Sequence, residues 1–135
     1  MNEMEKIDLK ISEQEFADLN LRYPNHGKSS VISGRADELV KMHFRNQNNN
    51  CVFEKLSNGG DLRITSIDEV LEIEIKGTAE TGINWQRLKV SGKPSYRLLI
   101  NGLPLYRVCG VYERFPVIYI LHFCRDFDMR TEPRW

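Results

Sequence analysis

The chain has 135 residues, of which 41% are apolar, and its 19 Lys and Arg side chains balance 19 Asp and Glu side chains. At this length a chain buries about 60 to 70% of the surface that it exposes when unfolded, so one domain over residues 1–135 with its own core is expected. The even charge balance excludes a protein that holds polyanions by bulk positive charge alone.

The cysteines and the apolar runs indicate the compartment. Cys51, Cys109 and Cys124 are odd in number and far apart, and no CxxC pair occurs, which favours a reducing compartment over a disulfide scaffold or a zinc ribbon. The longest apolar run, over residues 117–124 and interrupted by His122, is far shorter than the roughly 20 residues that span a bilayer. The charged N-terminus lacks the apolar segment of a secretory signal. We therefore expect a cytoplasmic protein without membrane contact.

The first part of the chain carries helical patterns. Ser12 opens a capping box, which predicts a short helix that ends at about Asn20. After a turn rich in Pro, Asn and Gly, Ser33 is expected to cap a longer helix over residues 34–47. Residues 1–33 are therefore interpreted as an N-terminal helical extension, and the core of the domain is expected to follow it.

From residue 51 the apolar positions alternate instead of following a helical period. Three short strands are predicted over residues 51–56, 61–67 and 70–76, joined as a meander. Side chains alternate along a strand, so the third strand has one aliphatic face and one charged face. The aliphatic face carries Leu71, Ile73 and Ile75, and the charged face carries Glu72, Glu74 and Lys76.

The last part of the chain returns to strands after a polar segment over residues 79–95. One or two helical turns are expected near residues 84–90, and an Asn101-Gly102 hairpin turn follows. Strands are predicted over residues 96–100, 105–108 and 117–123. The fold class expected is α+β (α/β), with a mixed β-sheet flanked by helices and extra C-terminal strands within residues 81–135.

The charges are unevenly spread along the chain. Residues 54–80 carry seven acidic against three basic side chains, whereas residues 85–115 carry six basic against one acidic. An acidic site beside a basic flank suits a protein that holds a metal ion and a phosphate backbone. The same distribution also suits charges that only solvate loops.

Two carboxylates and an amine fall on neighbouring predicted strands. Asp61 stands at the start of one strand, and Glu74 and Lys76 share a face of the next. Carboxylates converging from adjacent strands are hard oxygen ligands suited to Mg²⁺ or Mn²⁺, and the backbone carbonyl of Ile75 offers another oxygen. Lys76 would stand beside the metal, where it positions or helps to deprotonate a water and offsets charge on the transition state. This is the chemistry of a phosphodiesterase.

The pattern Asp61…Glu74-Ile75-Lys76, after a helix that bears Glu38, resembles the PD-(D/E)xK nucleases, the superfamily of restriction endonucleases and Holliday-junction resolvases. The resemblance covers about residues 34–80. It implies an αβββαβ core with the motif on its second and third strands, a restriction-endonuclease-like fold and a Mg²⁺-dependent endodeoxyribonuclease. It further implies that Glu38 adds to the metal site and that Gln86 is a further polar active-site residue. Gly60 precedes Asp61 where the family pattern has proline.

Lysine and arginine side chains supply the salt-dependent part of nucleic-acid binding. The phosphate contacts are therefore expected from the basic flank, at Arg87, Lys89, Lys93 and Arg97. DNA is the expected partner, with RNA left open. A domain of this size holds one site, and cutting both strands of a duplex needs two, so a homodimer is expected for that activity.

Two other readings of the sequence stay open. In the first, the chain is a nucleic-acid-binding member of the same fold without activity, and it binds DNA without metal. In the second, it is a small α+β protein-interaction module whose acidic strand is only a solvated face. Fold does not fix function, so the site has to decide among them.

Overall fold

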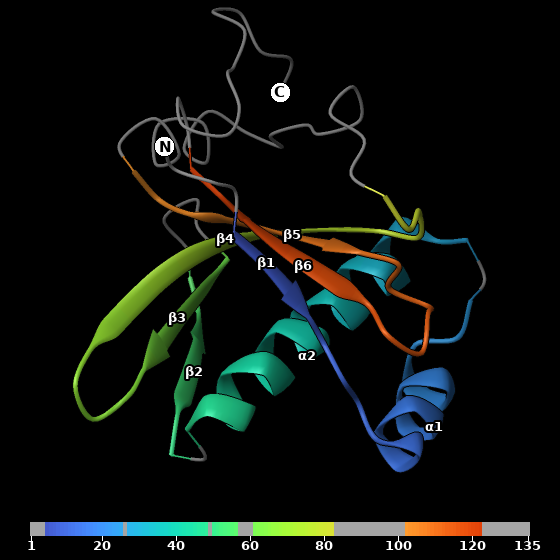
Figure 1. Ribbon diagram of the computed structural model, residues 1–135, viewed down its shortest axis with the longest axis horizontal. Coiled ribbons are helices and arrows are strands. Elements are labelled where there is room, and N and C mark those ends of the chain that lie inside the picture. The colour runs from blue at the N-terminus through green and yellow to red at the C-terminus, as the bar shows by residue number, and fades with distance from the viewer. Residues whose placement is uncertain (1–4, 26, 49, 57–60, 83–101, 123–135) are drawn as a thin grey trace, which may run out of the picture.

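The computed structural model describes residues 5–25, 27–48, 50–56, 61–82 and 102–122, and the structural statements below concern these residues. Within them the chain forms two helices and a six-stranded mixed sheet, which confirms an α+β fold (Figure 1). In chain order the elements are β1 (Glu5–Asp8), α1 (Glu13–Arg22), α2 (Ser29–Gln47), β2 (Val52–Lys55), β3 (Leu62–Thr65), β4 (Val70–Thr78), β5 (Leu105–Cys109) and β6 (Val117–Leu121).

Helix α1 begins as its sequence predicts. The Ser12 hydroxyl accepts a hydrogen bond from the backbone N–H of Glu15 at 3.0 Å, and the Glu15 carboxylate accepts one from the N–H of Ser12 at 2.8 Å. The two bonds satisfy amide donors that the first helical turn leaves unpaired. The predicted end near Asn20 is two residues short of the observed end at Arg22.

Helix α2 begins earlier than predicted. It starts at Ser29, with Lys28 as its N-cap, so Ser33 lies inside the helix rather than at its start. Gly34 also lies inside the helix, where a Cβ would lie 2.5 Å from the Tyr23 ring. The absent side chain lets Tyr23 pack against the helix, and Ile32 adds one more apolar turn to the stripe that packs on the core.

The N-terminal residues are not wholly a helical extension. Glu5–Asp8 form β1, an edge strand that pairs antiparallel with β6, with Ile7 opposite Ile118. The segment consists of one apolar residue, Ile7, and three charged ones. It therefore has no hydrophobic periodicity that would predict a strand. The interpretation of residues 1–33 as only helical is therefore wrong at this strand.

Strand β4 is the centre of the sheet, whose order is β1-β6-β5-β4-β3-β2. Its first half, Val70 to Ile73, pairs antiparallel with β3, and its second half, Glu74 to Thr78, pairs parallel with β5. A parallel pair needs a crossover connection, and the chain between β4 and β5 passes through residues 83–101, outside the described residues. The predicted strand over residues 96–100, the turn near 84–90 and Asn101 also lie there.

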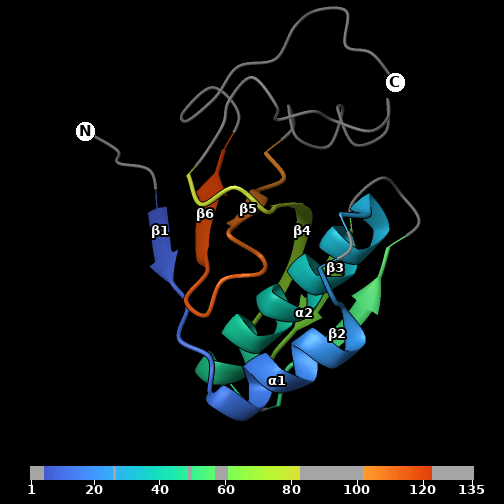
Figure 2. The ribbon, with the colours of Figure 1, turned by 90° about the vertical axis from the view of Figure 1, so that its right-hand side faces the viewer.

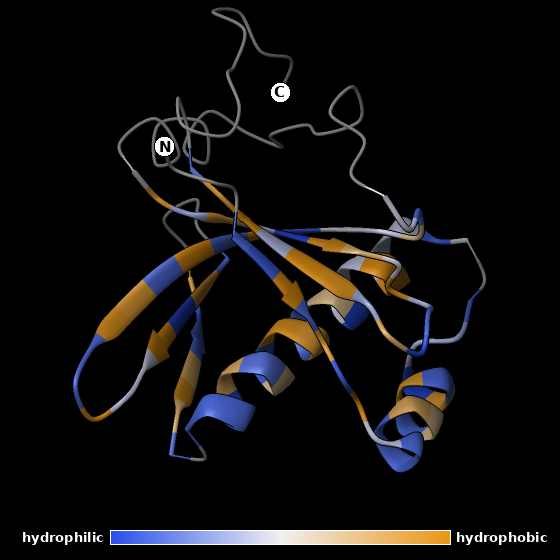
Figure 3. Cartoon of the chain, in the orientation of Figure 1, coloured by the Kyte–Doolittle hydropathy of each residue, from blue (hydrophilic) through white to orange (hydrophobic). Residues whose placement is uncertain are grey.

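Helix α2 packs on one face of the sheet and α1 lies beside it (Figures 1 and 2). Ile73 and Ile75 of β4 are buried with Leu39 and Val40 of α2 in one hydrophobic core. Hydrophobic and hydrophilic residues alternate along β4 (Figure 3). Its odd-numbered side chains therefore face α2, and its even-numbered ones face the opposite side of the sheet.

The helix comes close to the sheet at a glycine of β4. A Cβ at Gly77 would lie 2.6 Å from the Ala36 Cβ and 3.2 Å from the Ile32 carbonyl oxygen. This close approach fixes the position of α2 over β4. Neither described helix is long and apolar enough to cross a membrane.

Candidate active site

Asp61 stands just before β3, and its hydrogen bonds fix it to β4. Its backbone N–H donates to the carbonyl of Ile73 at 2.9 Å, and its carboxylate Oδ2 accepts from the N–H of Ile75 at 2.7 Å. The pairing of β3 with β4 begins only at Leu62, so no backbone carbonyl of β3 accepts a hydrogen bond from the N–H of Ile75. The Asp61 carboxylate accepts that bond instead. Asp61 is therefore held opposite Glu74, the residue between its two partners.

Glu74 and Lys76 lie on the face of β4 opposite α2. The Glu74 side chain is nearly inaccessible, at 2% exposure, whereas that of Lys76 is 23% exposed. Lys76 Nζ lies 3.9 Å from Glu74 Oε1. Burial of a carboxylate is costly unless a cation or hydrogen bonds stabilise it, and the ammonium group supplies part of that stabilisation. The predicted pairing of a carboxylate and an amine on one face is therefore present.

The three residues gather where β4 changes neighbours. Asp61 directly precedes Leu62, the first β3 residue paired with β4. Glu74 is the first β4 residue paired with β5. The N–H and C=O groups of one strand residue point to the same side of the strand. The Ile75 carbonyl, predicted as a further oxygen ligand, is therefore directed to the side on which its N–H meets Asp61.

Asp37 of α2 is a further carboxylate of this region. Its pKa is raised from 3.8 to about 6, first by burial and then by the negative charge of Asp61, while Lys55 and Lys41 act in the opposite direction. The charge of Asp61 reaches Asp37 strongly enough to favour its protonated form, so the two carboxylates repel each other when both are ionised. The helix therefore brings Asp37 into the electrostatic range of Asp61.

Glu38, the helix residue predicted from the family pattern, has other partners. Its carboxylate lies 3.7 Å from Nη1 of Arg22 on α1 and 3.8 Å from Nζ of Lys41. At 100° per residue, Glu38 lies about 160° around the helix from Val40, whereas Asp37 lies about 60° from it. A helical projection of the sequence therefore predicts that Asp37 lies nearer the sheet than Glu38 does.

The donor set fits a magnesium ion bound in the usual way. Proteins hold Mg²⁺ through one or two carboxylates, and water and phosphate oxygens fill the other positions. Asp61 and Glu74 supply the carboxylates, and the Ile75 carbonyl adds an uncharged oxygen. Across the described ranges, no group of three or more His, Cys, Asp or Glu residues forms a metal cage made by the protein alone.

Comparisons of the chain with protein families, with curated proteins and with solved structures found no match. The candidate site therefore stands on its own geometry and on the sequence pattern.

Several predicted residues lie outside the described residues, namely Gln86, Arg87, Lys89, Lys93 and Arg97. A buried basic residue of the described sheet, Arg107, was not predicted as a site residue. Arg107 is the third residue of β5, a strand in which all five residues are buried. A single charged residue inside an apolar strand is the sequence feature that could have identified it.

Proposed function

We propose that the protein is a metal-dependent nuclease that hydrolyses phosphodiester bonds of DNA at Asp61, Glu74 and Lys76. The observation that carries the proposal is the hydrogen bond from the Ile75 N–H to the Asp61 carboxylate. It joins Asp61 to the residue between Glu74 and Lys76. Asp61 therefore lies close to these two residues, although they follow it by 13 and 15 positions in the sequence.

The order of the elements supports the same proposal. Helix α2 is followed by β2, β3 and β4, and β5 then lies parallel to β4. Asp61 precedes the second strand after the helix, and Glu74 and Lys76 lie on the third. This is the placement that the likeness to the PD-(D/E)xK nucleases implies, and a restriction-endonuclease-like fold is part of the proposal.

Each residue has a distinct proposed role. Asp61 and Glu74 would hold the metal ion together with the Ile75 carbonyl, and the ion, when bound, supplies Lewis-acid stabilisation of the phosphate. Lys76 places an ammonium group beside the site, where it orients the attacking water and offsets charge on the phosphate oxygens. Asp37 of α2 is proposed to act on the site only through its electrostatic interaction with Asp61.

The test is cleavage of supercoiled plasmid and of single-stranded DNA in Mg²⁺, in Mn²⁺ and in EDTA. Cutting is expected only with metal, and Glu74→Gln or Lys76→Met is expected to lower its rate about a hundredfold or more. Glu72→Gln is the matched control. It changes the other glutamate on the same face of β4, which is bonded to Arg63 at 2.8 Å, and the cutting rate should not change.

Contradiction would take either of two forms. Cutting in EDTA, or cutting that survives both active-site substitutions, would indicate a contaminating nuclease. Wild-type protein that binds DNA in EDTA but cuts no substrate would favour the second candidate, a nucleic-acid-binding protein without activity. For that candidate, calorimetric titration with Mn²⁺ would show no binding.

A further inference from the structure

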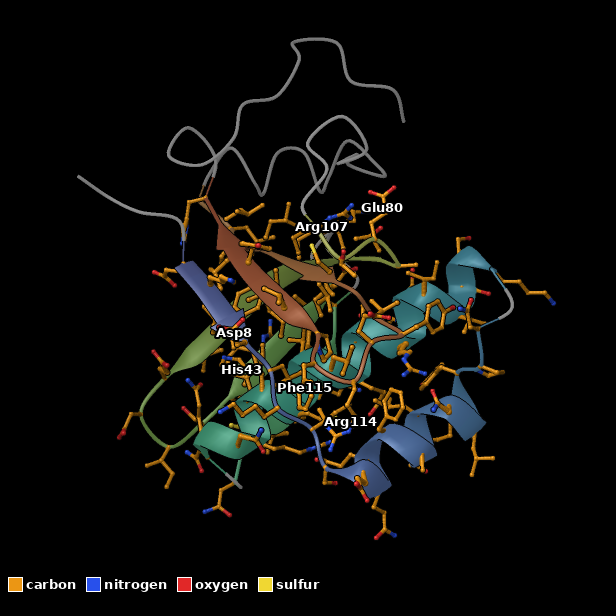
Figure 4. All side chains as sticks on the ribbon, turned by 45° about the vertical axis from the view of Figure 1, so that its right-hand side comes forward. Asp8, His43, Glu80, Arg107, Arg114 and Phe115 are labelled. Carbon is orange, nitrogen blue, oxygen red and sulfur yellow. The ribbon has the colours of Figure 1, made fainter. Side chains whose placement is uncertain are left out.

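Arg107 is a buried cation with an incomplete set of partners. It is 5% exposed, and its Nε is enclosed without a hydrogen-bond partner. Burial lowers its pKa, while the charges of Cys109 and Glu80 act in the opposite direction. Figure 4 shows Arg107 close to Glu80 at one end of the sheet. A buried guanidinium that lacks hydrogen bonds costs folding free energy, so its presence in an apolar strand calls for a cause.

The other buried arginine shows what a structural role looks like in this protein. Arg35 is fully buried, and its Nη1 donates to the Asn20 side chain at 2.9 Å and to the Tyr23 carbonyl at 3.1 Å. Its Nε donates to the Val111 carbonyl, and its guanidinium lies 5.1 Å from the centre of the Tyr112 ring. Arg35 therefore joins α1 and α2 to the segment after β5 through three hydrogen bonds, although its Nη2, like the Nε of Arg107, is buried without a partner.

The sheet register places Arg107 beside the candidate active site. Lys76 of β4 is paired with Arg107 of β5. Paired residues of neighbouring strands share a face and stand about 5 Å apart. The two cations are therefore neighbours on the face that carries Glu74. Glu74 lies beside Lys76 at 3.9 Å, and Arg107, whose charge Glu80 offsets in part, still has a buried Nε without a hydrogen-bond partner.

We infer that Arg107, together with Lys76, forms a binding site for a phosphodiester group of the DNA backbone. The planar guanidinium offers parallel N–H donors that match phosphate oxygens, and charge-assisted bonds of this kind are stronger than neutral ones. The identity of the ligand rests on the proposed function, because a phosphate held at Arg107 would lie next to the residues assigned to hydrolysis. The role is one of binding and positioning, on the opposite face of the sheet from α2.

The test measures binding of a short fluorescein-labelled DNA duplex in EDTA, by anisotropy at several sodium chloride concentrations. Arg107→Met is expected to weaken binding about tenfold and to lower the slope of log K against log salt by about one. Urea unfolding of the same variant is expected to give a midpoint equal to or higher than that of the wild type, because methionine removes a buried charge. Arg63→Met is the matched control, since Arg63 is an arginine of β3 already paired with Glu54 and Glu72, and its affinity should equal that of the wild type.

The outcomes separate this inference from the proposed nuclease. If the wild type cuts DNA but Arg107→Met binds DNA as tightly as the wild type, the phosphate site at Arg107 is refuted and the proposed nuclease activity is supported. If the wild type cuts no substrate, and Arg107→Met nevertheless weakens DNA binding, the nuclease activity is refuted and the phosphate site is supported. A lower urea midpoint for Arg107→Met would show a structural arginine and overturn the inference. Equal loss of affinity in Arg63→Met, or no DNA binding by the wild type at low salt, would also overturn it.

Discussion

The Asp61 carboxylate has a structural contact as well as a proposed chemical role, and two substitutions separate them. Asparagine keeps an oxygen that can accept from the Ile75 N–H, which Asp61 binds at 2.7 Å, whereas alanine leaves that amide without a partner. Asp61→Asn should keep the free energy of unfolding near that of the wild type, and Asp61→Ala should lower it by about 1 to 2 kcal/mol. Urea unfolding measures both values.

Both Asp61 variants should lose metal-dependent cutting, because neither has the carboxylate. An Asp61→Asn protein that cuts DNA like the wild type would restrict Asp61 to its structural contact.

Asp37 should make stability depend on pH. Its pKa is raised from 3.8 to about 6 in the folded protein, so the folded state holds this proton more tightly than the unfolded state does. The stabilisation is complete below about pH 4 and is lost as the pH rises through 6. Above pH 6 the ionised Asp37 opposes folding by on the order of 1 to 2 kcal/mol, once solvent screening is counted.

The measurement is urea unfolding in EDTA at pH 5 and pH 7.5. Wild-type protein should lose stability relative to Asp37→Asn between the two values, and Asp68→Asn, which changes an exposed turn residue, should follow the wild type. Equal pH dependence in wild type and Asp37→Asn would contradict the assignment.

The residues of the site were predictable to different degrees. Asp61, Glu74 and Lys76 could be predicted to lie near one another because their spacing along the chain follows from strand geometry. Asp37 was passed over for its neighbour Glu38, since a family pattern names a helix position and not a direction around the helix. Arg107 was not predicted because its proposed role depends on the Lys76 pairing, a contact between segments about 30 residues apart that no local pattern contains.

At the scale of elements, the contact between α2 and β4 depends on Gly77. Its missing side chain admits Ala36, because a Cβ at position 77 would lie 2.6 Å from the Ala36 Cβ. Gly77→Ala should therefore destabilise the protein by about 1 to 3 kcal/mol, as overpacking of a close contact does. The unfolding midpoint in urea measures this loss.

A second substitution tests the mechanism. Ala36→Gly removes the atom that the new methyl group meets, so the Gly77→Ala, Ala36→Gly double variant should be more stable than the sum of the two single effects predicts. Strict additivity would show that the loss comes from backbone conformation instead of the contact with the helix.

The elements themselves were predictable where local chemistry decides them. The capping box set the start of α1 because both of its hydrogen bonds lie within four residues. The start of α2 was misplaced because Ser33, a residue type that often caps helices, lies inside the helix, while the actual N-cap, Lys28, makes no side-chain capping bond that a sequence pattern could indicate. Strand β1 was missed because its pairing with β6, at the other end of the chain, makes it a strand.

At the scale of the whole molecule, the sheet combines two kinds of connection. The meander β2-β3-β4 uses short links and could be predicted from alternation and turns. The parallel placement of β5 beside β4 and the position of β1 at the far edge depend on pairings across long stretches of chain. Such topology is not contained in strand patterns, which explains why the fold class was predicted and the strand order was not.

The pairing of β1 with β6 has a consequence for how the protein is made. A ribosome releases residues 29–78, which hold α2, the meander and all the proposed metal ligands, well before it releases β5 and β6. Those two strands bring Arg107 to Lys76 and give β1 its only neighbour in the sheet order. During translation the emerging chain would therefore carry the acidic residues of the candidate site before Arg107 is made, and the face proposed to bind phosphate would be completed near the end of synthesis.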